Sequence, residues 1–364
     1  MKLQQKLGIL LSSISLFSFI SYAEAEPKVV TSIKPLHSLI SYVMDGVGSP
    51  NLLVDGSSSP HTFQLKPSHA TMLQEAEVVF WIGEDLESFL ETPLDSIAVN
   101  AKKITLMESD QIELLKFREK NVFDDHHDEH EEHADGHDEH EGHDDHDEHE
   151  GHDDHDEHEE HADGHDEHEG HDDHDEHEEH ADGHDEHEGH DDHGHHHGEF
   201  DIHFWLDPEI AKSIVKIASL ELSEVDPANQ ATYQTNASNA VSELDKLIND
   251  TRTKINSDAK YIVFHDAYQY FEQRFGIEVI GALTVNPEVL PGAKQLAEIR
   301  EVIEHEKVNC LFSEPQFNPS IANTIAQDTG IKAAVLDPLG AELEPGKELY
   351  FQLINDMASS FESC

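Results

Sequence analysis

The chain has 364 residues and a formal net charge of −57, because 79 Asp and Glu residues outnumber 22 Lys and Arg. Such a charge disfavours binding to nucleic acid or to an anionic membrane surface, both of which attract basic proteins. We therefore expect neither as a partner. The charge suits a protein that gathers cations.

The first 25 residues are typical of a secretory signal peptide. Lys2 and Lys6 precede an apolar run over Leu7–Ile20, and Ala23-Glu24-Ala25 fits the small-residue cleavage pattern. The run is short for a membrane span, which needs about 20 apolar residues. We expect cleavage, a mature protein that begins near Glu26, and a location outside the cytoplasm without a membrane anchor. A retained anchor is the alternative.

Strand and helix patterns alternate after the signal segment. Short β-rich apolar runs predict strands, and helical spacing of apolar residues predicts helices. In chain order we predict strand Val29–Ile33, helix Leu36–Met44, strand Asn51–Val54, helix Pro67–Glu75, strand Val78–Ile82, helix Glu84–Glu91 and strand Lys103–Leu106. This alternation implies a parallel sheet covered by helices. We assign 26–123 to an N-terminal α/β lobe, which 200–227 completes.

Residues 124–199 are almost entirely His, Asp, Glu and Gly. They hold 26 of the 32 histidines, 38 acidic residues and no Lys or Arg, and the string HDEHEEHADG occurs three times. Histidine recurs mostly at every third position, which matches neither a helix nor a half-buried strand. The segment lacks the apolar side chains of a core, so we expect a disordered insertion.

The composition of this tract indicates a protein that handles metal. Imidazole suits zinc, copper and nickel, and carboxylate suits harder cations. An acidic solubilising linker is the alternative, although it would not need so many histidines. We expect a secondary metal-binding loop whose ligands include His126, His127, His130, His133, His193, His195, His196 and His197.

A second α/β pattern follows the tract. Helix Pro208–Glu224 precedes a helical pattern over Ala231–Ile255, and we assign 228–257 to a linking helix and 258–364 to a C-terminal α/β lobe. The strands predicted there are Tyr261–Phe264, Glu278–Leu283, Cys310–Phe312 and Ala333–Leu336, and the helices are Ala267–Phe275, Gly292–His305, Ser320–Asp328 and Lys347–Phe361. The predicted fold is α/β, with two lobes, each a mainly parallel sheet flanked by helices, joined by one long rigid helix.

Three of the six histidines outside the tract occupy positions where α/β proteins bind ligands. His61 follows the second predicted strand, His203 precedes a helix, and His265 ends a strand; Asp337 likewise follows a strand. Ligands bind outside the carboxyl ends of the strands in open α/β sheets, so these residues predict a site between the lobes. Three imidazoles with a carboxylate or water form a tetrahedral set that zinc favours.

The other three histidines carry weaker signals. His37 could line the cleft or cap a helix, His69 lies within a predicted helix as a structural residue, and His305 lies at a charged, exposed helix end.

The two cysteines are Cys310 and Cys364. An oxidising compartment favours their pairing, and two independent thiols are the alternative. With so few cysteines, a cysteine-based zinc site is excluded.

Six strings in order carry a family resemblance. They are Pro60-His61 with Leu65-Lys66-Pro67-Ser68, His203-Phe204-Trp205-Leu206-Asp207-Pro208, Phe264-His265-Asp266-Ala267-Tyr268, Thr284-Val285-Asn286-Pro287-Glu288, Ser313-Glu314-Pro315-Gln316 and Leu336-Asp337-Pro338-Leu339-Gly340. Together they resemble the periplasmic zinc-binding components of bacterial ABC importers, the ZnuA type within the cluster A-I solute-binding proteins. The resemblance covers nearly the whole mature chain.

The resemblance implies a site and a role. It makes His61, His203 and His265 ligands of Zn(II), and His265 separates the chain from manganese-binding relatives, which have a carboxylate there. Pro60 replaces the acidic residue that precedes the first ligand in some members. Asp337, which matches the aspartate ligand of related members, would then be the fourth ligand, and a water is the alternative. The resemblance also implies a Cys310–Cys364 disulfide, and a monomer that delivers zinc in the periplasm to an inner-membrane ABC permease and its ATPase.

Two other function classes compete with zinc transport. A metalloenzyme would also use three histidines and an open position, but no His-Glu-x-x-His motif or other evident general base is present. A periplasmic metal buffer or chaperone without a transport role would make the tract itself the functional part. We expect a transport receptor and not an enzyme.

Overall fold

The computed structural model describes residues 26–118, 198–255, 259–284, 287 and 289–364, which belong to one compact unit. The expected signal peptide and the eight tract histidines named above lie outside the described residues. In the described part of the chain, no helix combines the length and the apolar composition that a membrane span requires.

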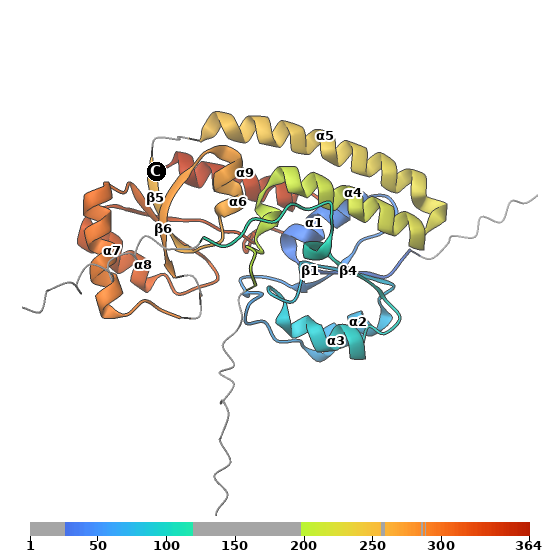
Figure 1. The fold of residues 1–364 in the computed structure, drawn as a ribbon. Coiled ribbons are helices and arrows are strands. Elements are labelled where there is room, and N and C mark those ends of the chain that lie inside the picture. Colours follow the sequence, from blue (N-terminus) through green and yellow to red (C-terminus); the bar gives the residue numbers. More distant parts are fainter. Residues whose placement is uncertain (1–25, 119–197, 256–258, 285–286, 288) are drawn as a thin grey trace, which may run out of the picture. The chain divides into compact units, whose positions relative to one another are not determined.

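The first half of the chain folds around a parallel sheet of four strands in the order β2-β1-β3-β4 (Figure 1). Every residue of the two central strands is buried, as expected for parallel strands covered on both faces. In Figure 1, α2 and α3 lie on one side of this sheet and α1 and α4 on the other. The elements are β1 (Val29–Ile33), α1 (Lys34–Val43), β2 (Asn51–Val54), α2 (Pro67–Glu75), β3 (Val78–Trp81), α3 (Glu91–Ser96), β4 (Lys102–Thr105) and α4 (Pro208–Val225).

The second half repeats this topology in a sheet of order β6-β5-β7-β8, again all parallel. Helices α7 and α8 pack on one face through a separate apolar cluster, and α6 and α9 pack on the other. The elements are β5 (Lys260–His265), α6 (Gln269–Phe275), β6 (Glu278–Thr284), α7 (Ala293–Glu306), β7 (Cys310–Ser313), α8 (Ser320–Thr329), β8 (Lys332–Val335) and α9 (Leu349–Glu362).

The helix α5 (Gln230–Lys254) follows α4 along the chain and contacts α4, α1 and α9 (Figure 1). Its buried side chains, among them Tyr233, Leu244 and Leu247, belong to an apolar cluster that also includes side chains of both sheets. Burial of apolar surface is the main favourable term in folding, so this shared core joins the two sheets. The predicted α/β class with two mainly parallel sheets is confirmed.

The segment Glu84–Glu91 differs from its predicted helix. It contains only a short 3-10 turn at Ser88–Leu90, and α3 begins at Glu91. The carboxylate of Glu87 is buried and accepts the backbone N–H groups of Ile82 at 3.0 Å and Gly83 at 2.9 Å. These bonds shape the segment into a turn after β3, and burial raises the pKa of Glu87 to about 7.

The two cysteines form a disulfide with their Cα atoms 5.9 Å apart. Cys310 begins β7 and is fully buried, and Cys364 follows α9. The bridge closes a loop over 54 positions and thereby fixes the last helix against the second sheet.

Candidate metal site

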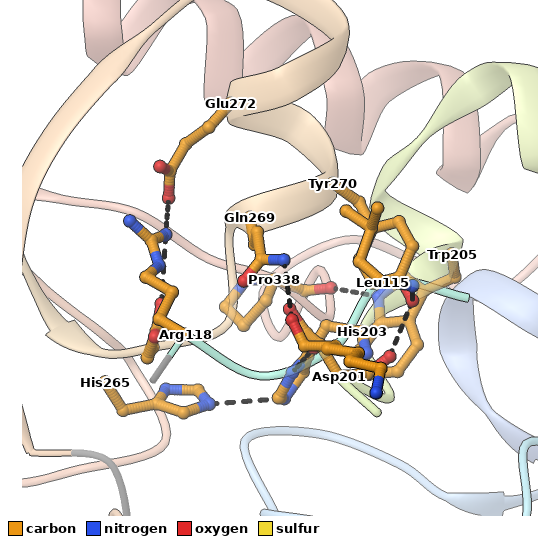
Figure 2. Close-up of polar contacts among 12 residues, drawn as sticks. Leu115, Arg118, Asp201, His203, Trp205, His265, Gln269, Tyr270, Glu272 and Pro338 are labelled. Atoms are coloured by element: carbon orange, nitrogen blue, oxygen red, sulfur yellow. Dashed lines mark hydrogen bonds and ion pairs between the residues drawn. The ribbon is translucent and has the colours of Figure 1, made fainter. Parts of the chain in front are cut away.

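Three histidines from separate segments converge on one pocket. His61 lies in the loop after β2, His203 directly precedes the 3-10 turn Phe204–Leu206, and His265 is the last residue of β5. One ring nitrogen of each can be chosen so that all three lie within 4.8 Å of one another. The Nε2 atoms of His203 and His265 are 3.3 Å apart, and Figure 2 shows the two rings pointing toward each other.

The position of His203 follows from the polypeptide that surrounds it. Its carbonyl accepts the N–H of Leu206, and the indole N–H of Trp205 donates to the carbonyl of Pro338 at 2.9 Å. The hydroxyl of Tyr350 donates in turn to the carbonyl of Trp205 at 2.7 Å. These bonds join the start of α4 to α9 and to the loop after β8, so His203 lies on a backbone that is fixed from two directions.

The pocket has mainly apolar walls. His203 and His265 are each only 4% exposed, while His61 is half-buried. The side chains that line the pocket are Ser59, Pro60, His61, Leu86, His203, Trp205, His265, Glu314, Gln316, Phe317, Pro338 and Leu339. The three imidazoles share the lining with Ser59, Glu314 and Gln316, and the apolar side chains of the wall would limit the access of water to a bound ion.

Two buried carboxylates lie behind the histidines. Oδ1 of Asp201 is 2.8 Å from Nδ1 of His203, and the oxygens of Glu314 are 2.7 and 2.9 Å from Nδ1 of His265. Burial lowers the pKa of His265, but the negative charge and hydrogen bonds of Glu314 outweigh it, so the net shift of the His265 pKa is upward. Of the two acids, only Glu314 lies within a motif string, and no pattern in the sequence indicated the contacts of either acid with a histidine.

Asp337 lies at the expected place after β8 but is not part of the three-histidine group. Its Oδ1 accepts the N–H groups of Leu339 and Gly340, each at 3.0 Å, and the amide of Gln316 at 2.9 Å. Its Oδ2 accepts the N–H of Ala341 at 2.6 Å. The carboxylate is therefore engaged in shaping its own loop, in the manner of Asp residues that bond to the backbone of a turn.

The buried ammonium group of Lys34 binds the same loop from the other side. Its Nζ donates to the carbonyls of Gly340, Ala341 and Leu343 at 3.1, 2.9 and 2.9 Å. Lys34 begins α1, so the first half of the chain holds the loop that forms one wall of the pocket. A buried lysine needs such partners because burial of an unpaired charge is costly.

The other described histidines lie outside the site. His37 is buried with Nε2 3.2 Å from the carbonyl of Pro50, and burial lowers its pKa. His69 accepts the N–H of Lys66 and stacks on Phe63, which is a structural role, and His305 is exposed.

A family model and several curated relatives all match this chain to the same protein family. The sequence model of the family described as ZnuA, the periplasmic component A of a zinc-uptake complex, matches residues 29–364. The high-affinity zinc uptake system protein ZnuA of Brucella abortus (strain 2308) is 43% identical over 346 residues, which cover 94% of this chain and 93% of the relative. The proteins of that name from Haemophilus influenzae and Yersinia pestis are 39% and 33% identical, over 93% of this chain and 93% and 92% of theirs.

Solved structures share the fold at lower identity. A crystal structure of ZnuA superimposes with a TM-score of 0.65 at 20% identity, covering 92% of this chain and 97% of that one. The solute-binding protein FpvC of Pseudomonas aeruginosa, in complex with Mn²⁺, also gives 0.65 at 16% identity, with coverages of 93% and 98%. At identities below 25%, these likenesses show the shared fold alone, so the choice of metal must be argued from the donor atoms.

The engaged carboxylate of Asp337 leads to a prediction. Asp337→Ala should lower the free energy of unfolding of the metal-free protein by about 2 kcal/mol, because several N–H donors lose their acceptor. Asp95→Ala is the control, since that exposed carboxylate pairs with Lys103 at the surface and should cost less than about 1 kcal/mol. Urea titration measures both. If Asp337→Ala left stability unchanged but weakened zinc binding more than tenfold, the residue would be a ligand and not a loop-shaping group.

Proposed function

The chain belongs to the ZnuA family of periplasmic zinc-uptake components, and we propose that it captures Zn(II) with His61, His203 and His265. We propose further that it delivers the ion to an inner-membrane ABC permease with its ATPase. The observation that carries the proposal is the convergence of three imidazoles, from three distant segments, in a pocket with mainly apolar walls. Proteins of this family bind and carry a solute and are not enzymes.

The donor set supports zinc as the cargo. Zn²⁺ prefers four ligands in tetrahedral arrangement and accepts neutral imidazole nitrogens at about 2.0–2.1 Å. Nitrogen donors that lie within 4.8 Å of one another leave room for one ion between them. In the proposed complex, solvent supplies the fourth ligand, because the Asp337 carboxylate is engaged with the backbone of its loop.

The processing and organisation of the chain are part of the same proposal. Residues 1–25 are removed as a signal peptide, and the mature protein works as a monomer in the periplasm. We assign the two sheets to two lobes, 26–123 with 200–227 and 258–364, linked through 228–257. The pairing of the cysteines is consistent with an oxidising compartment.

The tract at 124–199 is proposed to collect zinc as a secondary site. Its 26 histidines supply abundant ligands, and its negative charge attracts cations over distance. Ligands that are not held in place lose conformational entropy on binding, so each tract site is weaker than the pocket. The alternative function, a periplasmic metal buffer without transport, rests on this tract alone.

Removal of any one pocket histidine should abolish tight binding. His61→Ala, His203→Ala and His265→Ala should each weaken zinc affinity by more than about 100-fold, since even the partners behind metal ligands are worth 10–100-fold. The measurement is competition with a zinc chelator, in protein that carries a Gly/Ser linker in place of the tract so that only the pocket is observed. His305→Ala, whose ring is exposed, is the control and should bind as the parent does. An unaltered affinity of His265→Ala would refute the site.

The raised pKa of His265 gives zinc binding a pH dependence of known sign. Zinc binds the neutral ring, so the affinity should fall as the pH falls through the raised pKa, beginning above the ordinary value of 6.5. The metal-free protein should respond in the opposite sense. The stabilisation from this group is fully present below pH 6.5 and is lost as pH rises through the folded-state pKa. Chelator competition and thermal melts between pH 5.5 and 8.5 test both signs, and His265→Ala should flatten the pH profile of the metal-free melting temperature.

Replacement of residues 124–197 by a short Gly/Ser linker separates transport from buffering. The linker keeps Glu199 and Phe200, whose backbone pairs with Phe117 and Lys116. The pocket should retain its zinc affinity within about threefold, because none of its three histidines lies in the replaced segment. The weaker sites should disappear, because their ligands are removed with the segment. A matched variant with the tract histidines changed to Ser keeps the negative charge and isolates its effect. Loss of the tight site would place the primary ligands in the tract and favour the buffer. Unchanged uptake by zinc-starved cells would contradict the collecting role proposed for the tract.

A further inference from the structure

We propose that Asp201 and Glu314 are positioning residues of the zinc site, holding His203 and His265 with their Nε2 lone pairs directed at the ion. The inference rests on the proposed function and extends it to residues that do not touch the metal. Neither acid was a candidate from the sequence. Both are nearly inaccessible, with exposures of 1% for Asp201 and 3% for Glu314.

The hydrogen bonds set the tautomer of each ring. An ionised carboxylate only accepts hydrogen bonds, so a nitrogen bonded to it carries the proton. Nδ1 of His203 is 2.8 Å from Asp201, and Nδ1 of His265 is 2.7 and 2.9 Å from the two oxygens of Glu314. In the neutral rings, Nε2 therefore has a free lone pair in both cases, and these are the two atoms that lie 3.3 Å apart in the pocket.

Asp201 is itself fixed from several directions. Its N–H donates to the carbonyl of Leu115 at 2.8 Å, and its carbonyl accepts the hydroxyl of Tyr270 at 2.7 Å (Figure 2). The same hydroxyl accepts the N–H of Leu115 at 2.8 Å. Oδ1 of Asp201 also accepts the N–H of His203, two residues later, at 2.9 Å. The carboxylate therefore cannot turn away from His203 without the loss of a second bond.

Glu314 is positioned by the second sheet. It follows the last residue of β7, while His265 is the last residue of β5, and these two strands pair in parallel. Carboxyl ends of adjacent parallel strands meet at the same edge, which places the acid behind the ring across a sequence separation of 49 residues.

The two acids also supply charge that the ligands lack. Three neutral imidazoles leave a buried Zn²⁺ with its full charge, and burial of an uncompensated ion is costly. Pro60 precedes the first ligand, and the carboxylate of Asp337 accepts hydrogen bonds from its own loop, so the described group of candidate ligands consists of three histidines. The carboxylates of Asp201 and Glu314 contact the rings of His203 and His265 on the side opposite the ion. Their two negative charges would offset the positive charge of the ion.

The test compares alanine and amide variants of the two acids in the linker-substituted protein. Asp201→Ala and Glu314→Ala should each weaken zinc affinity 10–100-fold, the range observed for the loss of such partners. Asp201→Asn and Glu314→Gln retain an accepting oxygen but not the charge, so their losses should be intermediate. Asp226→Asn is the matched control, because that buried carboxylate accepts the hydroxyl of Tyr233 and the amide of Asn229 and is not among the residues that line the pocket. It should bind zinc within about threefold of the parent.

A second readout needs no zinc. Long-range ¹H–¹⁵N spectra of the metal-free protein at pH 8 should show His203 and His265 with the proton on Nδ1, and each alanine variant should lose this signature only for its own histidine. A purely structural role would lower the melting temperature without this selective change.

Affinities of both alanine variants within threefold of the parent, or unaltered tautomers, would overturn the proposal. Full recovery of affinity in the amide variants would overturn its charge component. If His265→Ala also bound zinc as tightly as the parent, the error would lie in the proposed site and not in the positioning role.

Discussion

The approach of two imidazole nitrogens to 3.3 Å is the constraint on which the site depends. With both Nδ1 atoms directed at carboxylates, two neutral rings would meet lone pair to lone pair, an arrangement that only a proton or a cation between them makes favourable. The folded chain therefore imposes a contact that the isolated side chains would avoid. The two Nε2 lone pairs are therefore directed at the position that a cation would occupy.

Such a contact persists only if the surrounding structure is stiff. The core shared by the two sheets, with α1, α4, α5 and α9, fixes the segments that carry His203 and His265. Lys34 and Asp337 fix the carbonyl and N–H groups of the loop that forms one wall. Because this order is established during folding, zinc binding does not have to supply it, and preorganised ligands bind more tightly than an equal number on a chain without fixed structure.

Much of the fold could be predicted because the signals are local. Central parallel strands are buried on both faces and contain continuous apolar runs, so β1 and β5 were found within one residue of their observed ends. The three histidines that the structure brings together were candidates because they follow strands or precede a helix, and their motif context added specificity. The predicted helix at Glu84–Glu91 was wrong because the side chain of Glu87 bonds to the preceding backbone, which helical propensity does not include.

The unpredicted features are contacts between distant residues. Lys34 reaches a carbonyl 306 positions away, and Glu314 reaches a histidine 49 positions away. Contacts over such sequence separations produce no periodic pattern of residues, so a single sequence does not reveal them. Asp337 shows a different limit, because an aspartate before a proline at a strand end can serve a metal or its own turn. The sequence determined its place, and the bonds to Leu339 and Ala341 show which groups its carboxylate contacts in the folded chain.

In the proposed site the negative charge comes from carboxylates and the ligand atoms come from imidazoles, and this division affects the choice of metal. Carboxylate oxygens suit harder cations such as Mn²⁺, whereas imidazole nitrogens suit Zn²⁺. A site that needed negative charge and took it from a ligating carboxylate would gain affinity for both kinds of ion. In the proposed site, Asp201 and Glu314 supply that charge from behind the rings, so all protein donors to the ion remain nitrogens. The donor atoms and charges of the proposed site, and not its scaffold, are therefore the features that would favour zinc.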